Sequence, residues 1–429
     1  NLAKAKKKKS DSSKSRKSKP KKMQNLKGFK DIKPNQQKYW RFIYEKTRTC
    51  AIDYSYKKID TPILESIDLF ERTVGETSDI VSKEMFAFKD KGGDMVVLRP
   101  EITAPVVRAY IQHGMLSLPQ PVMLWYWGPV FRYDKPQAGR YRQFHQFGFE
   151  VLGSDSAEVD SQLIAMARNL FRSFGLDVTV QINSIGCKAC RKKYIKDLTA
   201  FLKDKKLCTD CKDRLEENPL RILDCKKKKC KQEIAEAPQI VDSLCEECKE
   251  HFVKVLEGLD NESVVYNLDP FLVRGLDYYS RTTFEIYLTD EKQKSQNALA
   301  GGGRYDYLTE QLGGRPTPAV GFAGGIERAI IKLKELGVEI EDTQQGDVFI
   351  AQLGADAKKK AKKLFNDLRK EEIKVRQAFT RKGLADQMEV ANKMNIKYAL
   401  ILGQKEILDD TIIIRDMNTG DPIANCILD

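Results

Sequence analysis

The stretch from Trp127 to Glu150 reads WGPVFRYDKPQAGRYRQFHQFGFE and predicts the hairpin around which the chain folds. An apolar strand ends in an arginine, a basic loop with glycine and proline follows, and a second strand returns. Successive side chains of an extended strand point to opposite faces. One face therefore carries Arg140, Arg142, Phe144, Gln146, Gly148 and Glu150, and the other carries His145, Phe147, Phe149 and Val151.

The two faces of this second strand predict different roles. The face with His145 and Phe147 is mainly aromatic and apolar, which predicts that it packs in a core. The opposite face combines a ring, an amide, a glycine gap and a carboxylate, flanked by guanidinium groups. Such a set can hold a purine, its phosphates and a small cationic substrate. The alternative is an ordinary amphipathic hairpin, which seldom carries arginine, glutamine and glutamate on one face.

The hairpin resembles motif 2 of the class II aminoacyl-tRNA synthetases, and RYRQFHQFGFE is similar to that segment of the histidine-specific family, the histidyl-tRNA synthetases. Further landmarks follow in the order of the family. They are KKIDTPILESIDLFERT with Pro62 as motif 1, LRPEIT with Glu101 and Thr103, LVRGLDYYSRTTFEIY as the histidine signature, GGGRYDYL, and PAVGFAGGIERAIIKL as motif 3. The resemblance extends from about Met23 to Asp429.

This resemblance implies an α+β fold, in which helices flank the antiparallel sheet of a class II synthetase. Alternating apolar residues support strands at Val96–Leu98, Val122–Arg132, Arg142–Leu152 and Thr282–Leu288. After Asp347, strands alternate with helices, which predicts a small α/β anticodon-binding domain with a largely parallel sheet. We expect a disordered basic arm (1–22), a first catalytic part (23–182), a Cys-rich, mainly helical insertion (183–260), a second catalytic part (261–340) and the anticodon-binding domain (345–429).

The composition predicts a soluble, cytoplasmic protein. Hydrophobic residues make up 41% of the chain, and no apolar run approaches the roughly 18 residues of a membrane span.

The net charge is +13, but residues 1–22 alone carry eleven Lys/Arg and the single Asp11, so the remainder is nearly neutral. Such an arm can attract RNA phosphates without reading bases. The alternative is a solubilising or targeting extension with no RNA role.

The activity that the resemblance implies is the joining of L-histidine to ATP, followed by transfer of the histidyl group to the 3' end of histidine tRNA. Negative charge develops on the α-phosphate during the first step, so arginines and Mg²⁺ bound with ATP are the expected stabilisers. By resemblance, the catalytic residues are Arg132, Arg274 and Arg328. The residues implied for ATP binding are Arg132, Asp134, Arg140, Phe144 and Arg328, with Phe144 against the adenine.

The resemblance also implies a histidine-binding set. Glu101 and Thr103 would face the α-amino group, Gln146 the carboxylate, and Glu150 with Tyr279 the imidazole. The full set is Glu101, Thr103, Arg132, Gln146, Glu150, Arg274, Tyr278 and Tyr279. Lys135 and Gln137 are expected at the tRNA acceptor end, the helix Gly383–Met394 at the anticodon, and motif 1 in the contact of a homodimer.

Eight cysteines gather in four closely spaced pairs, which are Cys187 and Cys190, Cys208 and Cys211, Cys225 and Cys230, and Cys245 and Cys248. Two-residue gaps let both thiolates of a pair reach one ion, so four pairs can form two tetrahedral zinc sites. Reduced structural thiols and redox pairs are the alternatives. Cys50 and Cys426 are expected to be plain thiols.

Other polar residues are assigned structural roles. His145 lies on the apolar face of its strand, which predicts a packed, hydrogen-bonded residue. The lysines of Lys226–Lys229 and Lys358–Lys363 are expected on solvated faces rather than against RNA.

Two other functions remain alternatives. One is the noncatalytic class II paralogue that regulates histidine biosynthesis, which typically lacks an intact RGLDYY segment, the motif 3 arginine and the C-terminal domain. The other is a nonenzymatic RNA-binding module, which would leave the polar face of the hairpin unexplained.

Overall fold

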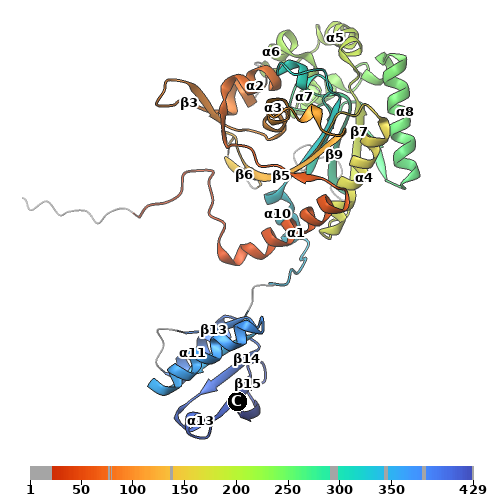
Figure 1. Ribbon diagram of the computed structural model, residues 1–429. Helices are drawn as coiled ribbons and strands as arrows, with labels where there is room; N and C mark the ends of the chain where they lie inside the picture. Colours follow the sequence, from red (N-terminus) through yellow and green to blue (C-terminus); the bar gives the residue numbers. More distant parts are fainter. Residues whose placement is uncertain are drawn as a thin grey trace, which may run out of the picture. The chain divides into compact units, whose positions relative to one another are not determined.

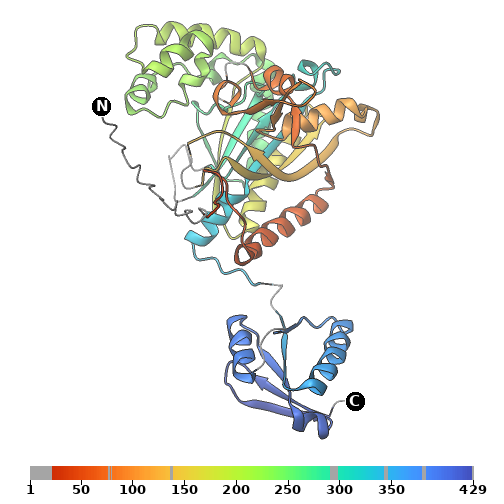
Figure 2. The same ribbon diagram turned by 90° about the vertical axis from the view of Figure 1, so that its left-hand side faces the viewer.

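The computed structural model describes residues 22–75, 78, 80–135, 139–289, 298–342, 346–378 and 383–427. The chain divides into two compact units, one mainly of residues Lys46–Glu335 and one mainly of residues Leu336–Asp429. Figures 1 and 2 show both units. Among the described residues, no helix combines the length and the apolar character needed to cross a membrane.

An eight-stranded sheet forms the centre of the larger unit, in the order β1-β5-β6-β11-β10-β9-β7-β8. Neighbouring strands are antiparallel, except that β1 pairs with β5 and β8 with β7 in parallel. This is the antiparallel sheet that the sequence predicted. The strands are β1 (Lys57–Lys58), β5 (Val122–Phe131), β6 (Gln143–Leu152), β7 (Val178–Ser184), β8 (Tyr266–Leu268), β9 (Ser280–Leu288), β10 (Ala300–Arg304) and β11 (Ala319–Gly325).

The apolar face of β6 packs against helix α4 (Ala157–Ser173). The ring of Phe147 lies 5.8 Å from that of Phe171 in α4 and 6.1 Å from that of Phe174 just beyond it. Phe149 stacks on Phe322 of β11 with ring centroids 5.3 Å apart. The alternation of β6 is therefore confirmed on its core side. Helix α8 (Glu246–Asn261) runs beside α4, as Figure 1 shows.

Small residues leave space on the opposite face of the sheet. Gly301 of β10 lies opposite Glu285 of β9 and Ala323 of β11, and Ala323 lies opposite Gly148 of β6. Residues opposite one another in a sheet point to the same side. A β-carbon added to Gly301 would lie only 2.4 Å from a guanidinium nitrogen of Arg274, so the missing side chain makes room for that arginine.

A three-stranded sheet, in the order β2-β4-β3, borders this hollow face. It leads through Glu101 into helix α3, so the LRPEIT segment lies at the start of a helix. The elements here are β2 (Leu64–Ser66), β3 (Phe86–Lys89), β4 (Met95–Leu98), α2 (Ile67–Val74) and α3 (Thr103–Gln112), and the larger unit also contains α9 (Leu308–Gln311) and α10 (Ile326–Glu335). Helix α1 (Gln37–Asp53) is divided between the two units.

The Cys-rich insertion is mainly helical, as predicted. It follows β7, which continues to Ser184 and so extends slightly past the expected boundary at residue 183. Its helices are α5 (Lys188–Leu202), α6 (Thr209–Glu217), α7 (Lys228–Ile234) and α8. Figure 1 shows α5, α6 and α7 gathered at one end of the larger unit.

The smaller unit contains a five-stranded sheet, in the order β13-β12-β14-β15-β16. Only β13, β12 and β14 are parallel, so the prediction of a largely parallel sheet is corrected by two antiparallel strands. The short link between β15 and β16 explains this, because a parallel connection needs a long crossover. The elements are β12 (Val348–Gln352), α11 (Ala355–Lys370), β13 (Val375–Gln377), α12 (Leu384–Lys393), β14 (Tyr398–Leu402), α13 (Gln404–Leu408), β15 (Thr411–Asp416) and β16 (Pro422–Ile427).

Candidate functional site

A cavity of about 510 Å³ opens on the hollow face of the large sheet. The residues that line it come from β6, the start of α3, the 273–279 loop, β9, β10, α10 and the insertion. It brings together most of the residues expected to bind histidine and ATP. These are Glu101, Thr103, Arg132, Asp134, Arg140, Phe144, Gln146, Arg274, Tyr278, Tyr279 and Arg328.

Glu101 is held at one end of the cavity by the start of α3. Its carboxylate accepts hydrogen bonds from the backbone N–H groups of Thr103 at 2.7 Å and Ala104 at 2.9 Å. These groups belong to the first turn of the helix, where free N–H groups favour negative charge. Burial nevertheless outweighs these bonds and raises the pKa of Glu101. The carboxylate is thus fixed in orientation and poorly solvated, which suits it to bind a cationic group.

Glu150 lies beneath the cavity and is not one of its lining residues. Its carboxylate accepts hydrogen bonds from the hydroxyls of Thr103 at 2.6 Å and Tyr305 at 2.5 Å. It is fully buried, and burial raises the pKa of this carboxyl to about 8. Tyr305 was missing from the expected set, although the segment GGGRYDYL that contains it was part of the resemblance.

Arg274 faces the cavity from the histidine-signature loop. Its guanidinium forms an ion pair with Glu285 and lies 5.7 Å from the ring centre of Tyr279. Burial alone would lower the pKa of Arg274, but Glu285 and Tyr279 reverse this effect and raise it. Arg274 therefore stays charged within the site. The sequence did not identify Glu285 as a partner, because the pairing depends on how the loop that precedes β9 folds back over that strand.

Three further arginines face one another across the cavity. Arg132 donates from Nε to the carbonyl of Pro100 at 2.9 Å, and Arg328 donates to the carbonyl of Ala298 at 2.8 Å. Arg140 pairs with Asp134 at 2.8 Å. Burial and the nearby charges of Arg140 and Arg132 lower the pKa of Arg328. This mutual repulsion indicates a site for a strongly negative ligand, and the polyphosphate of a nucleotide meets that requirement.

Two buried polar atoms in the lining also require a partner. Among the residues that the structure describes, neither the side-chain oxygen of Gln146 nor Nε of Arg274 has a hydrogen-bond partner. Buried polar groups are normally paired, so a bound polar ligand is the natural partner for both. Phe144 also lines the cavity, and the Arg132 guanidinium lies 5.5 Å from the centre of its ring.

The residues expected at the tRNA acceptor end are only partly described. Lys135 is exposed in the loop that leads away from the cavity. Gln137 lies outside the described residues, so its expected position stays a prediction.

The insertion also contributes to the cavity lining, which the sequence did not predict. The contributing residues include Arg214, Arg221, Cys225, Lys226 and Lys227. Lys226 and Lys227 are exposed, as expected of a solvated face, but they border the cavity.

Hydrogen bonds tie the insertion to the loop that carries Arg274. Arg221 donates to the carbonyl of Arg274 at 3.1 Å. Asn218 donates to the carboxylate of Asp277 at 3.1 Å.

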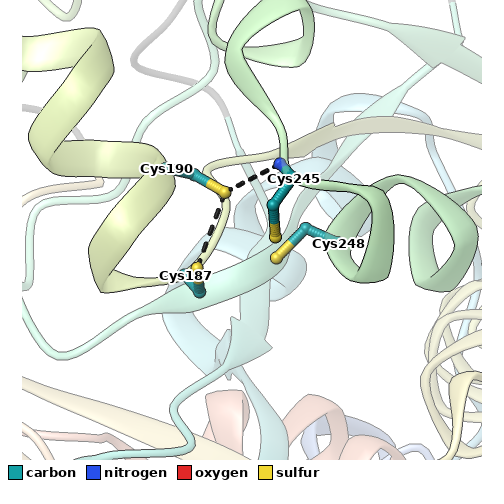
Figure 3. A group of neighbouring side chains, drawn as sticks. All are labelled: Cys187, Cys190, Cys245 and Cys248. Carbon is teal, nitrogen blue, oxygen red and sulfur yellow. Dashed lines mark hydrogen bonds between the residues drawn. The ribbon is translucent and has the colours of Figure 1, made fainter.

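The eight cysteines form two groups of four. One group, the first cysteine cluster, is Cys187, Cys190, Cys245 and Cys248, and the other, the second cysteine cluster, is Cys208, Cys211, Cys225 and Cys230. The ligand atoms within each group lie within 4.8 Å of one another. Figure 3 shows the first cluster, with sulfurs from the starts of α5 and α8 pointing toward one another.

Zinc–sulfur bonds of about 2.3 Å place the ligands of a tetrahedral site about 3.8 Å apart. The sulfurs of Cys187 and Cys190 are 3.5 Å apart, and those of Cys208 and Cys225 are 4.0 Å apart, so the donor set and its spacing fit zinc. In addition, the backbone N–H of Cys245 donates to the sulfur of Cys190 at 3.1 Å, an interaction that stabilises a thiolate.

His145 has the hydrogen-bonded structural position expected from its strand. Its backbone N–H and its ring Nδ1 both contact the carboxylate of Glu327 in α10, at 2.9 Å in each case. The contact holds the start of α10, and hence Arg328, against β6.

Two family models and many curated relatives match most of the chain. A family model described as histidyl-tRNA synthetase matches residues 28–329, and a second, described as an anticodon binding domain, matches residues 347–424. The histidine–tRNA ligase of Natranaerobius thermophilus is 44% identical over 399 residues, covering 92% of this chain and 94% of the relative. That of Dehalococcoides mccartyi (strain ATCC BAA-2266) is 45% identical over 397 residues, covering 92% and 94%.

Solved structures of other proteins also resemble this chain. The apo histidyl-tRNA synthetase of S. aureus superimposes with a TM-score of 0.80 at 37% identity, covering 95% of this chain and 98% of that one. A Bacillus halodurans C protein, described as an ATP phosphoribosyltransferase regulatory subunit/histidyl-tRNA synthetase, has a TM-score of 0.66 at 21% identity and covers 90% and 99%. This second likeness shows a common fold only.

Proposed function

The chain belongs to the histidyl-tRNA synthetase family, and from this premise we propose that its cavity activates L-histidine with ATP and then charges histidine tRNA. The observation that carries the proposal is the meeting, in one cavity, of a fixed carboxylate, Glu101, with Arg274 and three further arginines. One end therefore suits an α-amino group, and the other suits a polyphosphate.

We assign the residues around the amino acid according to their surroundings. Glu101 binds the α-amino group, because its carboxylate is buried and oriented by α3. Gln146 binds the substrate carboxylate through its amide N–H groups, while its unpaired side-chain oxygen is an acceptor for a donor of the ligand such as the α-amino group. Glu150 lies beneath the part of the cavity assigned to the imidazole and accepts hydrogen bonds from Thr103 and Tyr305, which it orients. Tyr279 lines the cavity beside the imidazole.

The arginines support attack of the histidine carboxylate on the α-phosphate of ATP. Arg274 lies nearest the amino-acid end and keeps its charge through Glu285, so it can bind both the reacting carboxylate and the phosphate. Arg132, Arg140 and Arg328 supply positive charge where negative charge develops on phosphate oxygens. Mg²⁺ bound with ATP would neutralise further phosphate charge, and Glu84 and Glu285 are oxygen donors of the kind that Mg²⁺ prefers.

The regulatory paralogue is the second candidate, and specific residues disfavour it. The chain keeps the RGLDYY segment, the Arg328 side chain in the cavity and a folded C-terminal unit. The deciding experiment is charging of histidine tRNA with radiolabelled histidine, with the Arg328→Ala variant as control. We expect charging by the wild type and a loss of about two orders of magnitude in the variant. No charging by the wild type would contradict the proposal.

We further propose that each cysteine cluster holds one structural zinc ion. Elemental analysis should find two zinc ions per chain, and Cys245→Ser should retain only that of the second cluster. Protein prepared anaerobically without chelator and found free of metal would contradict this proposal.

The motif 1 segment, in turn, is proposed to form a homodimer contact. Ile63 and Leu64 lie in it with 42% and 43% of their surfaces exposed, and Arg99 holds its backbone by donating to the carbonyls of Thr61 and Pro62. Light scattering of the full chain should give twice the chain mass, and a monomer at micromolar concentration would contradict it.

The cytoplasm is the proposed location, since free tRNA is charged there, and cell fractionation tests this.

A further inference from the structure

The second cysteine cluster borders the proposed ATP site. Cys225, one of its four sulfur donors, is itself a lining residue of the cavity, and Lys226 and Lys227 follow it directly in the chain. The first cluster contributes no lining residue among those described. The insertion is thus joined to the catalytic cavity through the second cluster.

The two neighbouring lysines differ in their partners. Lys227 forms an ion pair with Asp210 at 3.0 Å. Lys226 has no hydrogen-bond or ion-pair partner within 4 Å among the described residues, although it lines the same cavity. Burial lowers the pKa of Lys226, and repulsion by Arg140 and Arg328 adds to this, while attraction by Asp224 and Asp134 opposes it. An unpaired ammonium group therefore lies on the side of the cavity where the phosphate-facing arginines gather.

Acidic as well as basic side chains line the cavity, so its charge balance depends on which of them are paired. Arg132, Arg140, Arg328 and Lys226 line one cavity, and within the described part of the chain only Arg140 of these four has a carboxylate partner at bonding distance. Unpaired like charges at close range are costly, while charge-assisted hydrogen bonds to phosphate are strong. A polyphosphate satisfies all four groups, whereas the single carboxylate of an amino acid does not.

The position of Lys226 is set by the structure around it. Arg221, in the same segment, donates to the carbonyl of Arg274 at 3.1 Å, and Asn218 donates to Asp277 in the same loop at 3.1 Å. On the other side, the backbone N–H of Cys208 donates to the sulfur of Cys230 at 3.2 Å and closes the second cluster. The segment between these anchors has little freedom, so Lys226 is presented to the cavity in a defined place.

We propose that Lys226 is an additional ligand of the β,γ-phosphates of ATP, and of the pyrophosphate that leaves, and that the second cysteine cluster positions it. This inference rests on the proposed adenylation reaction. It makes the metal-binding insertion a part of the nucleotide site. A metal bound by Cys225 would order the backbone immediately before the lysine.

The test uses full-length Lys226→Ala, Lys226→Arg and, as a matched control, Lys229→Ala. Lys229 is an exposed residue of the same insertion that does not line the cavity. The measurements are the KM values for ATP and histidine in pyrophosphate exchange, the KM for tRNA in charging, the zinc content and the melting temperature.

We expect Lys226→Ala to raise the KM for ATP about tenfold, equivalent to about 1.4 kcal/mol. The KM for histidine, the zinc content and the melting temperature should match those of the wild type. Lys226→Arg should recover most of the ATP affinity, because it restores the charge, and Lys229→Ala should behave as wild type. A purely structural role would alter zinc content and melting temperature together, which would overturn the proposal.

Two other results would also overturn it. One is a KM for ATP within twofold of the wild-type value in Lys226→Ala. The other is an unchanged KM for ATP with a raised KM for tRNA, which would assign Lys226 to the acceptor end instead. Histidine-dependent exchange by the wild type establishes the adenylation reaction independently, so failure of this inference is distinguishable from failure of the proposed function.

Discussion

Replacing Gly301 by alanine should inactivate the site while leaving the fold intact. The new methyl group would lie 2.4 Å from one guanidinium nitrogen of Arg274 and 2.6 Å from the other. Ordinary contact begins near 3.4 Å, so the guanidinium must move by about 1 Å. The backbone of Gly301 has no positive φ, which means that alanine is not strained there. The obstruction is the far end of a flexible side chain, so the melting temperature should change little.

The displaced group is the one assigned to the reacting carboxylate and the α-phosphate. A misplacement of about 1 Å can cost about 10²-fold in rate, so we expect the adenylation rate of Gly301→Ala to fall by about that factor. Single-turnover formation of histidyl-adenylate measures this step. Gly383→Ala is the control, because its nearest new contact is an ordinary 3.7 Å.

A double-mutant cycle identifies the cause of the loss. If Gly301→Ala acts through Arg274, then adding it to Arg274→Ala should cost little more than Arg274→Ala alone. A near-normal rate in a folded Gly301→Ala protein would refute the reasoning, as would fully additive losses in the double variant.

Four further outcomes are expected. Arg274→Ala should fold and lower the adenylation rate by about two to three orders of magnitude, measured by pyrophosphate exchange, and a near-normal rate would show that this arginine is misassigned. The pKa of Glu150 is raised to about 8 in the fold, so this carboxyl favours folding at low pH, and that stability is lost as pH rises from about 4.5 to 8. Glu150→Gln cannot ionise and should therefore gain stability relative to wild type across that range in urea titrations, whereas a pH-independent difference would refute the shift. Lys135→Ala should impair transfer to tRNA more than adenylation, and equal losses in the two steps would oppose its placement at the acceptor end. Deleting residues 1–22 should weaken tRNA binding at low salt and leave adenylation unchanged, and equal affinity at every salt concentration would assign the arm elsewhere.

Local patterns predicted the parts of the fold that depend on local geometry. The two-residue period of Gln143–Leu152 placed Phe147 in the core and Gln146 in the cavity, because side-chain alternation is a property of any strand. The short gaps between cysteines, two residues in three of the pairs and four residues between Cys225 and Cys230, likewise predicted which thiols could act as pairs.

Long-range contacts could not be obtained in this way. The ion pair of Arg274 with Glu285 depends on how the loop that precedes β9 folds back over that strand, and the contact of Arg274 with Gly301 depends also on the register between β9 and β10. The hydrogen bond between Tyr305 and Glu150 joins residues that are 155 positions apart in the sequence. The sequence also left open which cysteine pairs combine, because the path of α5 to α8 decides it, and it gave no sign that the insertion lines the cavity. Strand β16 was missed because its side chains are mostly exposed on both faces, which leaves no alternation to detect.

The most direct test of the account is ATP–pyrophosphate exchange measured with each of the twenty amino acids separately, on full-length protein with Mg²⁺. We predict exchange with L-histidine alone, because the chain belongs to the histidyl-tRNA synthetase family and its cavity brings the Glu101 carboxylate together with Arg132, Arg140, Arg274 and Arg328. Exchange that depends on a different amino acid, or none with any of them in folded protein, would contradict the central claim.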